Sequence, residues 1–123
     1  MDLVKLPLRD EVWLVSLDPP VGSEMKKTRP CVIVSPDEVN RNLRTVLVAP
    51  MTTTERPYPT RVNMTFQSHR GHVALDQIRV VDKERIVRKL GSINPKTAKS
   101  ISLVLVELFF RSSNKQLSPI SGM

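Results

Sequence analysis

The strongest fold signal in the chain lies in residues 11–17, which read Glu11-Val12-Trp13-Leu14-Val15-Ser16-Leu17. β-Branched and aromatic side chains dominate this run, and such side chains favour extended backbone. Asp18-Pro19-Pro20 follows at once. Proline cannot donate to a β ladder, so the strand should end here. The stretch therefore predicts a first β-strand, followed by a long exposed loop that runs to Arg29.

Further short apolar segments follow downstream, separated by polar turns. Pro36 to Asn40 reads as a single helical turn with proline near its start. The turn between two later strands is predicted at Arg70-Gly71, because glycine punctuates strands. The segments expected to be strands are 31–35, 45–50, 60–66, 72–77 and 78–81. Several short strands with few helices predict a mainly β fold, a small barrel or curled sheet.

One substantial helix is predicted after Asn94, which suits an N-cap, with Pro95 at the first helical position. The stripe expected to face the core is Ala98, Ile101, Leu105 and Leu108. Other apolar side chains lie off this stripe: Val104, Val106 and Phe109. They leave open whether part of the helix packs on a second subunit or on its own core. With 123 residues the chain has room for one domain, which we assign to residues 1–111, and residues 112–123 are expected to be a flexible tail.

The charge of the chain is strongly positive, at +7 from 19 Lys and Arg against 12 Asp and Glu. Such a balance favours a polyanionic partner, either nucleic acid or an acidic protein, although a merely soluble basic protein has the same composition. The single Cys31 reads as a small buried hydrophobe and excludes an internal disulfide. Without a signal-like N-terminus or a long apolar run, we expect a cytoplasmic protein with no membrane span.

RNA cleavage without a metal needs a base for the 2′-hydroxyl, a cation for the crowded phosphorane and a proton for the departing 5′-oxygen. Glu24 and Arg29 lie five residues apart in the loop after the first strand, and Arg29 directly precedes the rigid Pro30. A carboxylate beside a two-pronged guanidinium suits this chemistry. A plain surface ion pair has the same spacing, so the residues alone leave both interpretations open.

Other polar side chains are candidates for substrate contacts. Thr52 and Thr53 end a predicted strand, where hydroxyls can bind phosphate or merely cap a turn. His69 and His72 flank the predicted turn and could act as an acid and base pair. No Cys, third His or carboxylate at metal-ligand spacing joins them, so we expect no metal and no cofactor. Tyr58, between two prolines, is the one ring free to stack on a base.

The order of several segments resembles the MazF/PemK (Kid) toxins of type II toxin–antitoxin systems. The matching segments are residues 11–19, Gly22-Ser23-Glu24, Arg29-Pro30, residues 32–36, residues 48–53, Tyr58-Pro59, residues 71–79 and residues 82–86. They follow one another in the family's order and spacing over about residues 9 to 110. No single segment is diagnostic, but their joint order identifies the chain as a member of this family.

The resemblance implies a small SH3-like barrel of antiparallel strands with a C-terminal helix. It implies a homodimer that cleaves single-stranded mRNA to 2′,3′-cyclic phosphate and 5′-hydroxyl ends, and an acidic antitoxin that neutralises it. Carried over by position, the catalytic residues are Glu24, Arg29 and Thr52. The residues expected to bind RNA are Lys26, Lys27, Thr53, Tyr58, Asp76 and Gln77.

Two positions depart from the family pattern. Asp10 stands where many members have glycine before the first strand, which affects the turn there. Ala74 stands where one branch places a catalytic arginine, so the acid of that branch cannot be transferred and Arg29 must do more of the phosphate work.

Two other functions remain compatible with the same fold. A CcdB-like toxin would bind gyrase rather than cut RNA, and retention of the Glu24 and Arg29-Pro30 loop speaks against it. A basic RNA-binding module would bind RNA without turnover.

Overall fold

The computed structural model describes residues 5–17 and 28–111 of the chain. Within these residues seven strands form one sheet in which every pairing is antiparallel. The strands are β1 (Glu11–Ser16), β2 (Thr28–Ile33), β3 (Thr45–Thr52), β4 (Arg61–Phe66), β5 (His69–Ala74), β6 (Arg79–Asp82) and β7 (Ile86–Ser92). The prediction of a mainly β fold with short antiparallel strands is confirmed.

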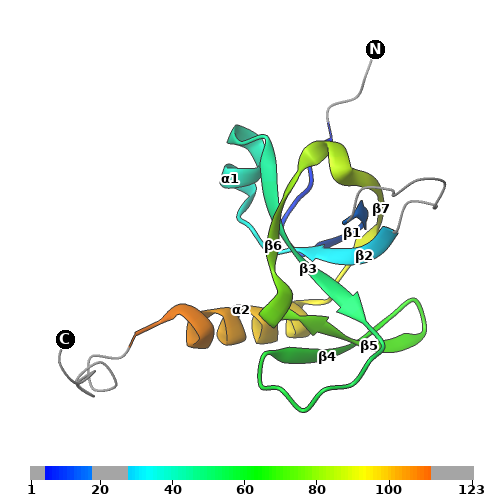
Figure 1. The fold of residues 1–123 in the computed structure, drawn as a ribbon, viewed down its shortest axis with the longest axis vertical. Coiled ribbons are helices and arrows are strands. Elements are labelled where there is room, and N and C mark those ends of the chain that lie inside the picture. Colours follow the sequence, from blue (N-terminus) through cyan, green and yellow to red (C-terminus); the bar gives the residue numbers. More distant parts are fainter. Residues whose placement is uncertain (1–4, 18–27, 112–123) are drawn as a thin grey trace.

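Strand β3 is the centre of the sheet. Its first half pairs with β6, its second half pairs with the end of β5, and β2 lies along its other edge. Figure 1 shows β3 joining the part of the sheet that holds β1, β2 and β7 to the β4–β5 hairpin. The C-terminal end of β3 therefore emerges between the two parts of the sheet.

The sheet is curled, because its two end strands come together. The strand order is β4-β5-β3-β2-β1-β7, so β4 and β7 are the ends. A Cβ on Gly91 of β7 would lie only 3.1 Å from the ring of Phe66 at the end of β4. The amide of Gln67 donates to the carbonyl oxygen of Leu90 over 3.2 Å. These contacts bring the sheet into the half-barrel that the resemblance implies.

Two apolar cores lie on opposite faces of the central strands. In β2, Val32 packs into one core, whereas Cys31 and Ile33 pack into the other. Because the second half of β2 and the middle of β3 are covered on both faces, the sequence there is continuously apolar and does not alternate. Cys31 is fully buried, as predicted, and burial raises the pKa of its thiol to about 12.

Two α-helices flank the sheet. Helix α1 (Asp37–Asn42) follows Pro36, as predicted, and is fixed by buried hydrogen bonds between Asn40 and Ser35. Helix α2 (Pro95–Phe109) starts at the predicted N-cap, where the side chain of Asn94 accepts from the Thr97 amide over 2.7 Å. Figure 1 shows α2 running beside the β4–β5 part of the sheet.

The predicted stripe of α2 is buried only at its N-terminal end. Ile101 is buried, and Ala98 and Leu105 pack against the same core. Leu108 is exposed instead, because the helix runs past the end of the sheet. The exposed apolar residues at this end are Leu103, Val106, Leu108, Phe109 and Phe110.

The predicted turn at Arg70-Gly71 is wrong. The chain reverses at Gln67 and Ser68, whose φ angles are +51° and +66°. A positive φ at both central residues matches the twist of a tight hairpin. Glycine or asparagine usually occupies such positions. Gly71 lies inside β5 for a packing reason, since a Cβ there would meet the Thr52 carbonyl oxygen at 2.9 Å.

The strand predicted at 72–77 also differs from the structure. β5 ends at Ala74, and η1 (Leu75–Gln77) is a 3₁₀ turn before β6. A second 3₁₀ turn, η2 (Lys83–Arg85), precedes β7. In the described ranges, no helix has both the length and the apolar character needed to span a membrane.

Candidate functional site

Arg29 lies on β2, opposite Val15 of β1, with an exposed side chain. Pro30 follows it within the strand and pairs with Leu14. The ladder between β2 and β3 begins only at Cys31, so Pro30 lies where no β3 carbonyl needs its missing N–H. Arg29 is thus held by its pairing with β1, just outside the paired residues of β2 and β3.

A hollow of about 440 Å³ gathers several predicted site residues. Its walls include Arg29 from β2, Thr52 and Thr53 from the end of β3, and His69 and Arg70 from β5. The structure therefore brings together Arg29 and both threonines, which are more than 20 residues away in sequence. Two guanidinium groups and two hydroxyls on one concave surface are suited to bind phosphate.

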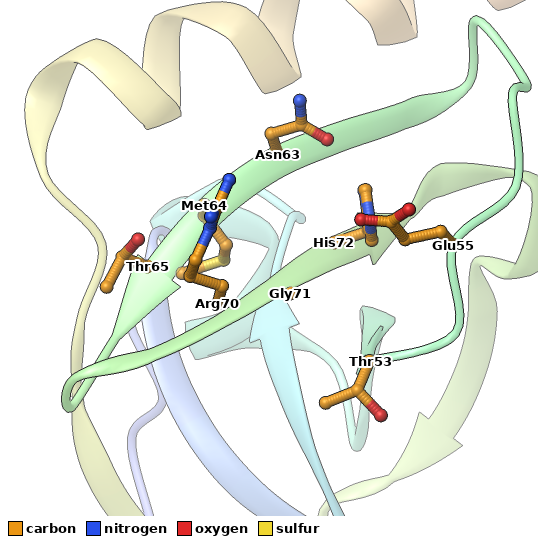
Figure 2. A pocket seen from close by; sticks show the side chains of 8 residues that line it. All are labelled: Thr53, Glu55, Asn63, Met64, Thr65, Arg70, Gly71 and His72. Carbon is orange, nitrogen blue, oxygen red and sulfur yellow. The ribbon is translucent and has the colours of Figure 1, made fainter.

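A second hollow of about 300 Å³ adjoins the first and shares Thr53, Arg70 and Gly71 with it. Figure 2 shows its side chains, which come from β4, from β5 and from the segment after β3. The carboxylate of Glu55 lies beside the ring of His72, with Glu55 Oε1 4.0 Å from His72 Nε2. The imidazole Nδ1 of His72 is buried and has no hydrogen-bond partner among the described residues.

Thr52 occupies the junction between the central strand and the site. Its hydroxyl oxygen accepts a hydrogen bond from the Thr54 amide over 3.1 Å, which is the turn-capping role. A hydroxyl that accepts one such bond still has its O–H hydrogen to donate, so capping and phosphate binding are compatible. The close approach of Gly71 to the Thr52 carbonyl holds this strand end against β5.

The two histidines do not flank a turn, since both lie within β5. His69 is exposed, and its Nδ1 lies 2.8 Å from the carbonyl oxygen of Gln67. His72 pairs with Thr52 across the ladder and is mostly buried. The histidines line different hollows, so they do not form a paired acid and base.

A separate polar cluster lies beyond the other end of β5 and contains Tyr58, Thr60, Arg61 and Asp76. The guanidinium of Arg61 makes a two-pronged contact with Asp76, at 2.7 Å from Nε to Oδ1 and 3.1 Å from Nη2 to Oδ2. This contact is the main reason that the pKa of Asp76 lies below its ordinary value. None of these side chains lines either hollow, and Gln77 is exposed outside both.

Sequence reasoning missed Arg61 and Arg70. Arg61 lies directly opposite Ala74 in the β4–β5 ladder, a relation that no local motif reveals. Arg70 lines both hollows, whereas the adjacent glycine favours a turn at this position. The predicted residues Glu24, Lys26 and Lys27 lie outside the described residues. Within residues 5–17 and 28–111, no three His, Cys, Asp or Glu side chains gather as a metal site would require.

The sequence matches a known protein family over most of its length. The model of the PemK-like, MazF-like toxin of type II toxin–antitoxin systems matches residues 8–109. The chain is 33% identical over 100 residues to the endoribonuclease MazF of Staphylococcus saprophyticus, which covers 76% of this chain and 83% of that protein. A shorter match to the endoribonuclease PemK of Escherichia coli is 52% identical over 44 residues, covering 36% of this chain and 33% of that protein.

The fold is also similar to that of solved structures. A mycobacterial endoribonuclease in complex with its cognate antitoxin superposes with a TM-score of 0.72 and 30% sequence identity. The superposition covers 86% of this chain and 98% of that one. The curled half-barrel with a C-terminal helix is therefore shared by this chain and that endoribonuclease.

Proposed function

This chain belongs to the PemK-like, MazF-like toxin family of type II toxin–antitoxin systems, and from that premise we propose that it is an endoribonuclease that cuts single-stranded RNA at selected sequences. The observation that supports the site most directly is the hollow in which Arg29 meets Thr52 and Thr53. Glu24, which lies outside the described residues, is the third member of the proposed catalytic set, with Arg29 and Thr52.

The proposed reaction uses no metal and is an internal transesterification. Glu24 takes the proton from the 2′-hydroxyl, and the 2′-oxygen attacks the adjacent phosphorus. Arg29 pairs with two oxygens of the crowded phosphorane and lowers its energy, while Thr52 donates a hydrogen bond that orients the phosphate. The bond from phosphorus to the 5′-oxygen breaks, and that oxygen takes a proton from water, while the proton held by Glu24 returns to the solvent. The products are a 2′,3′-cyclic phosphate and a 5′-hydroxyl.

RNA selection is assigned to side chains around this centre. Lys26 and Lys27 add positive charge beside Glu24, and Thr53 borders both hollows. Tyr58, Asp76 and Gln77 form a second contact region beyond the end of β5. Phosphate contacts supply most of the affinity of such a surface, whereas contacts to bases supply the selectivity.

We also propose that the protein acts in the cytoplasm as a homodimer that an acidic antitoxin blocks. The apolar side chains that α2 exposes toward its C-terminus support a second subunit, because monomeric proteins rarely expose such a patch. The +7 charge of the chain suits an acidic antitoxin segment that folds over the RNA surface. In sedimentation, the dimer should dissociate on Val106→Glu. Co-expression with the antitoxin should relieve growth arrest.

The assignment of Arg29 and Glu24 is tested by measuring single-turnover cleavage and RNA binding separately. Arg29→Lys keeps the charge but loses the two-pronged contact, and Glu24→Gln keeps the shape but loses the base. Both should lose most of the cleavage rate while RNA affinity changes little. Arg41→Lys, on the exposed end of α1, is the matched control.

The competing assignment is a histidine acid or base. His69→Ala and His72→Ala are therefore measured alongside. If a histidine variant loses cleavage while Arg29→Lys retains nearly all of it, the catalytic roles given to Glu24 and Arg29 are wrong.

A further inference from the structure

We propose that the ring of Tyr58 is a stacking subsite for one nucleobase of the RNA, and that Arg61, held by Asp76, is the positioning residue for this ring. The inference rests on the proposed function, since it concerns the same RNA. It assigns to Asp76 an indirect role through Arg61, rather than a contact with a base.

The guanidinium of Arg61 is fixed more firmly than that of a surface arginine. The side chain is only 6% exposed, and two of its nitrogens bind the two oxygens of Asp76. The hydroxyl of Thr60 donates to the same carboxylate over 3.0 Å. Two-pronged contacts of this kind fix orientation as well as distance. Three of the carboxylate's acceptor positions are therefore already used, which leaves Asp76 little capacity to read a base.

Ala74 makes the room for this arrangement. It lies directly opposite Arg61 in the β4–β5 ladder and is fully buried. Cross-strand neighbours share one face of a sheet, so a long side chain at position 74 would compete with the arginine stem for the same space. The small methyl group lets Arg61 lie along the sheet and reach Asp76 in the middle of η1.

The fixed guanidinium in turn supports the ring of Tyr58. The Arg61 Cζ atom lies over this ring, 5.2 Å from its centroid, which is within the range of a cation–π contact. The Tyr58 carbonyl accepts from the Arg61 amide over 3.0 Å, closing a turn around Pro59. The ring is thus held by its neighbours on one face before any ligand arrives.

Nearly half of Tyr58 is exposed, which leaves ring surface available to a ligand. A guanidinium covers one face of a ring, and Tyr58 remains 47% exposed. A rigid, half-exposed ring is a stacking surface for a nucleobase, because every base has a π face and little conformational entropy remains to be lost. The positive charge behind the ring is balanced by Asp76, so the subsite should select for stacking rather than for phosphate.

The test combines single abasic substitutions in the RNA with variants of the ring. The probe is a short RNA that the wild-type protein cleaves, made resistant by a 2′-deoxy group at the cleaved position. Removing the stacked base should weaken wild-type binding by about 5- to 150-fold. Tyr58→Leu should weaken binding of the intact RNA by a similar factor, and removal of that base should then change its affinity by no more than about twofold. Tyr58→Phe should retain the wild-type pattern.

Arg61 is tested in both backgrounds. Arg61→Gln should weaken binding when Tyr58 is present and have little effect in the Tyr58→Leu background, whereas a merely structural arginine would weaken both equally. Arg41→Gln, which also removes one positive charge, is the matched control. Tyr58→Leu changes an exposed ring, so the abasic cycle decides the stacking claim even if Arg61→Gln does not fold.

The outcomes separate this inference from the proposed function. The inference is overturned if removal of a base lowers RNA affinity by the same factor in wild type and in Tyr58→Leu at every position. It is also overturned if Tyr58→Phe binds the RNA as weakly as Tyr58→Leu. Failure of the wild-type protein to cleave the parent RNA would instead overturn the proposed function.

Discussion

Gly71→Ala is expected to disturb the fold and the site together, because one added carbon meets the backbone of Thr52. The new Cβ would lie 2.9 Å from the Thr52 carbonyl oxygen. Contacts between carbon and carbonyl oxygen settle at about 3.3–3.6 Å, so β3 and β5 must separate there by about half an ångström. The oxygen belongs to the backbone of a paired strand and cannot rotate away.

Two effects of opposite sign set the loss of stability. Forcing an extra carbon into a packed contact costs about 1–3 kcal/mol. Replacing glycine by alanine also lowers the conformational entropy of the unfolded chain. This stabilises the folded protein by about 0.4–1 kcal/mol where alanine can adopt the native backbone conformation without strain. The φ angle of Gly71 is not among the positive ones, so this gain applies. Overpacking wins, and the free energy of unfolding should fall by about 1–2 kcal/mol, or about 4–8 °C in Tm for a chain of this size.

Cleavage should fall as well, since the displaced strand end carries Thr52. A misplacement of about 1 Å at a reacting centre costs on the order of 100-fold in rate, so half of that predicts a loss of about tenfold in single-turnover cleavage. Thermal unfolding and single-turnover cleavage are measured on Gly71→Ala, with Ser92→Ala at the exposed end of β7 as control. Unchanged or increased stability would refute the close approach, and full activity in a destabilised variant would refute the role of this strand end.

Three further predictions concern stability and binding. Asp10 has a φ of +74°, in the region that favours glycine, and burial is the main reason that the pKa of its carboxyl is raised. Asp10→Gly should therefore raise the free energy of unfolding by about 0.5–1 kcal/mol. Chemical denaturation measures this gain, and Asp10→Ala should not show it. Burial acts to raise the pKa of Glu11, but hydrogen bonds from Lys89 and neighbouring donors outweigh it and lower the pKa below 4.5. A lowered folded pKa stabilises above the unfolded value, so stability should fall as pH drops below about 4.5 through the folded pKa, and Glu11→Gln should flatten this part of the pH profile. RNA affinity should weaken steeply between about 50 and 200 mM salt as counterions are released, and an unchanged Kd in titrations would contradict a phosphate-binding surface.

The elements of the fold that follow from local chemistry were predictable from the sequence. The apolar run after Asp10, the Asn94 cap and the turn at Pro36 each carry their own signal, and the structure confirms them. The prediction of a turn at Arg70-Gly71 is wrong because glycine occurs both in turns and where two backbones approach closely. Here Gly71 lets β5 approach the backbone of Thr52. Strand β7 carries no strand signal in its sequence, since its apolar and polar residues do not alternate and most of them are exposed.

The candidate site was predictable only in part. Arg29 and Thr52 were chosen by position in a resemblance, and the structure places them in one hollow. The Arg61–Asp76 pair depends on cross-strand register, which links residues 15 apart and leaves no periodic trace in the sequence. This pair could not have been predicted from local secondary-structure propensity or from residue spacing.

Whether this chain cuts RNA through its own side chains alone is decided by measuring cleavage in the presence of a chelator. Purified protein is incubated with a long single-stranded RNA in EDTA, and the ends of the fragments are mapped and their chemistry determined. We predict cleavage at a recurring short sequence, with 2′,3′-cyclic phosphate and 5′-hydroxyl ends. Activity that disappears in EDTA and returns with a divalent ion, or ends that carry a 5′-phosphate, would contradict the account.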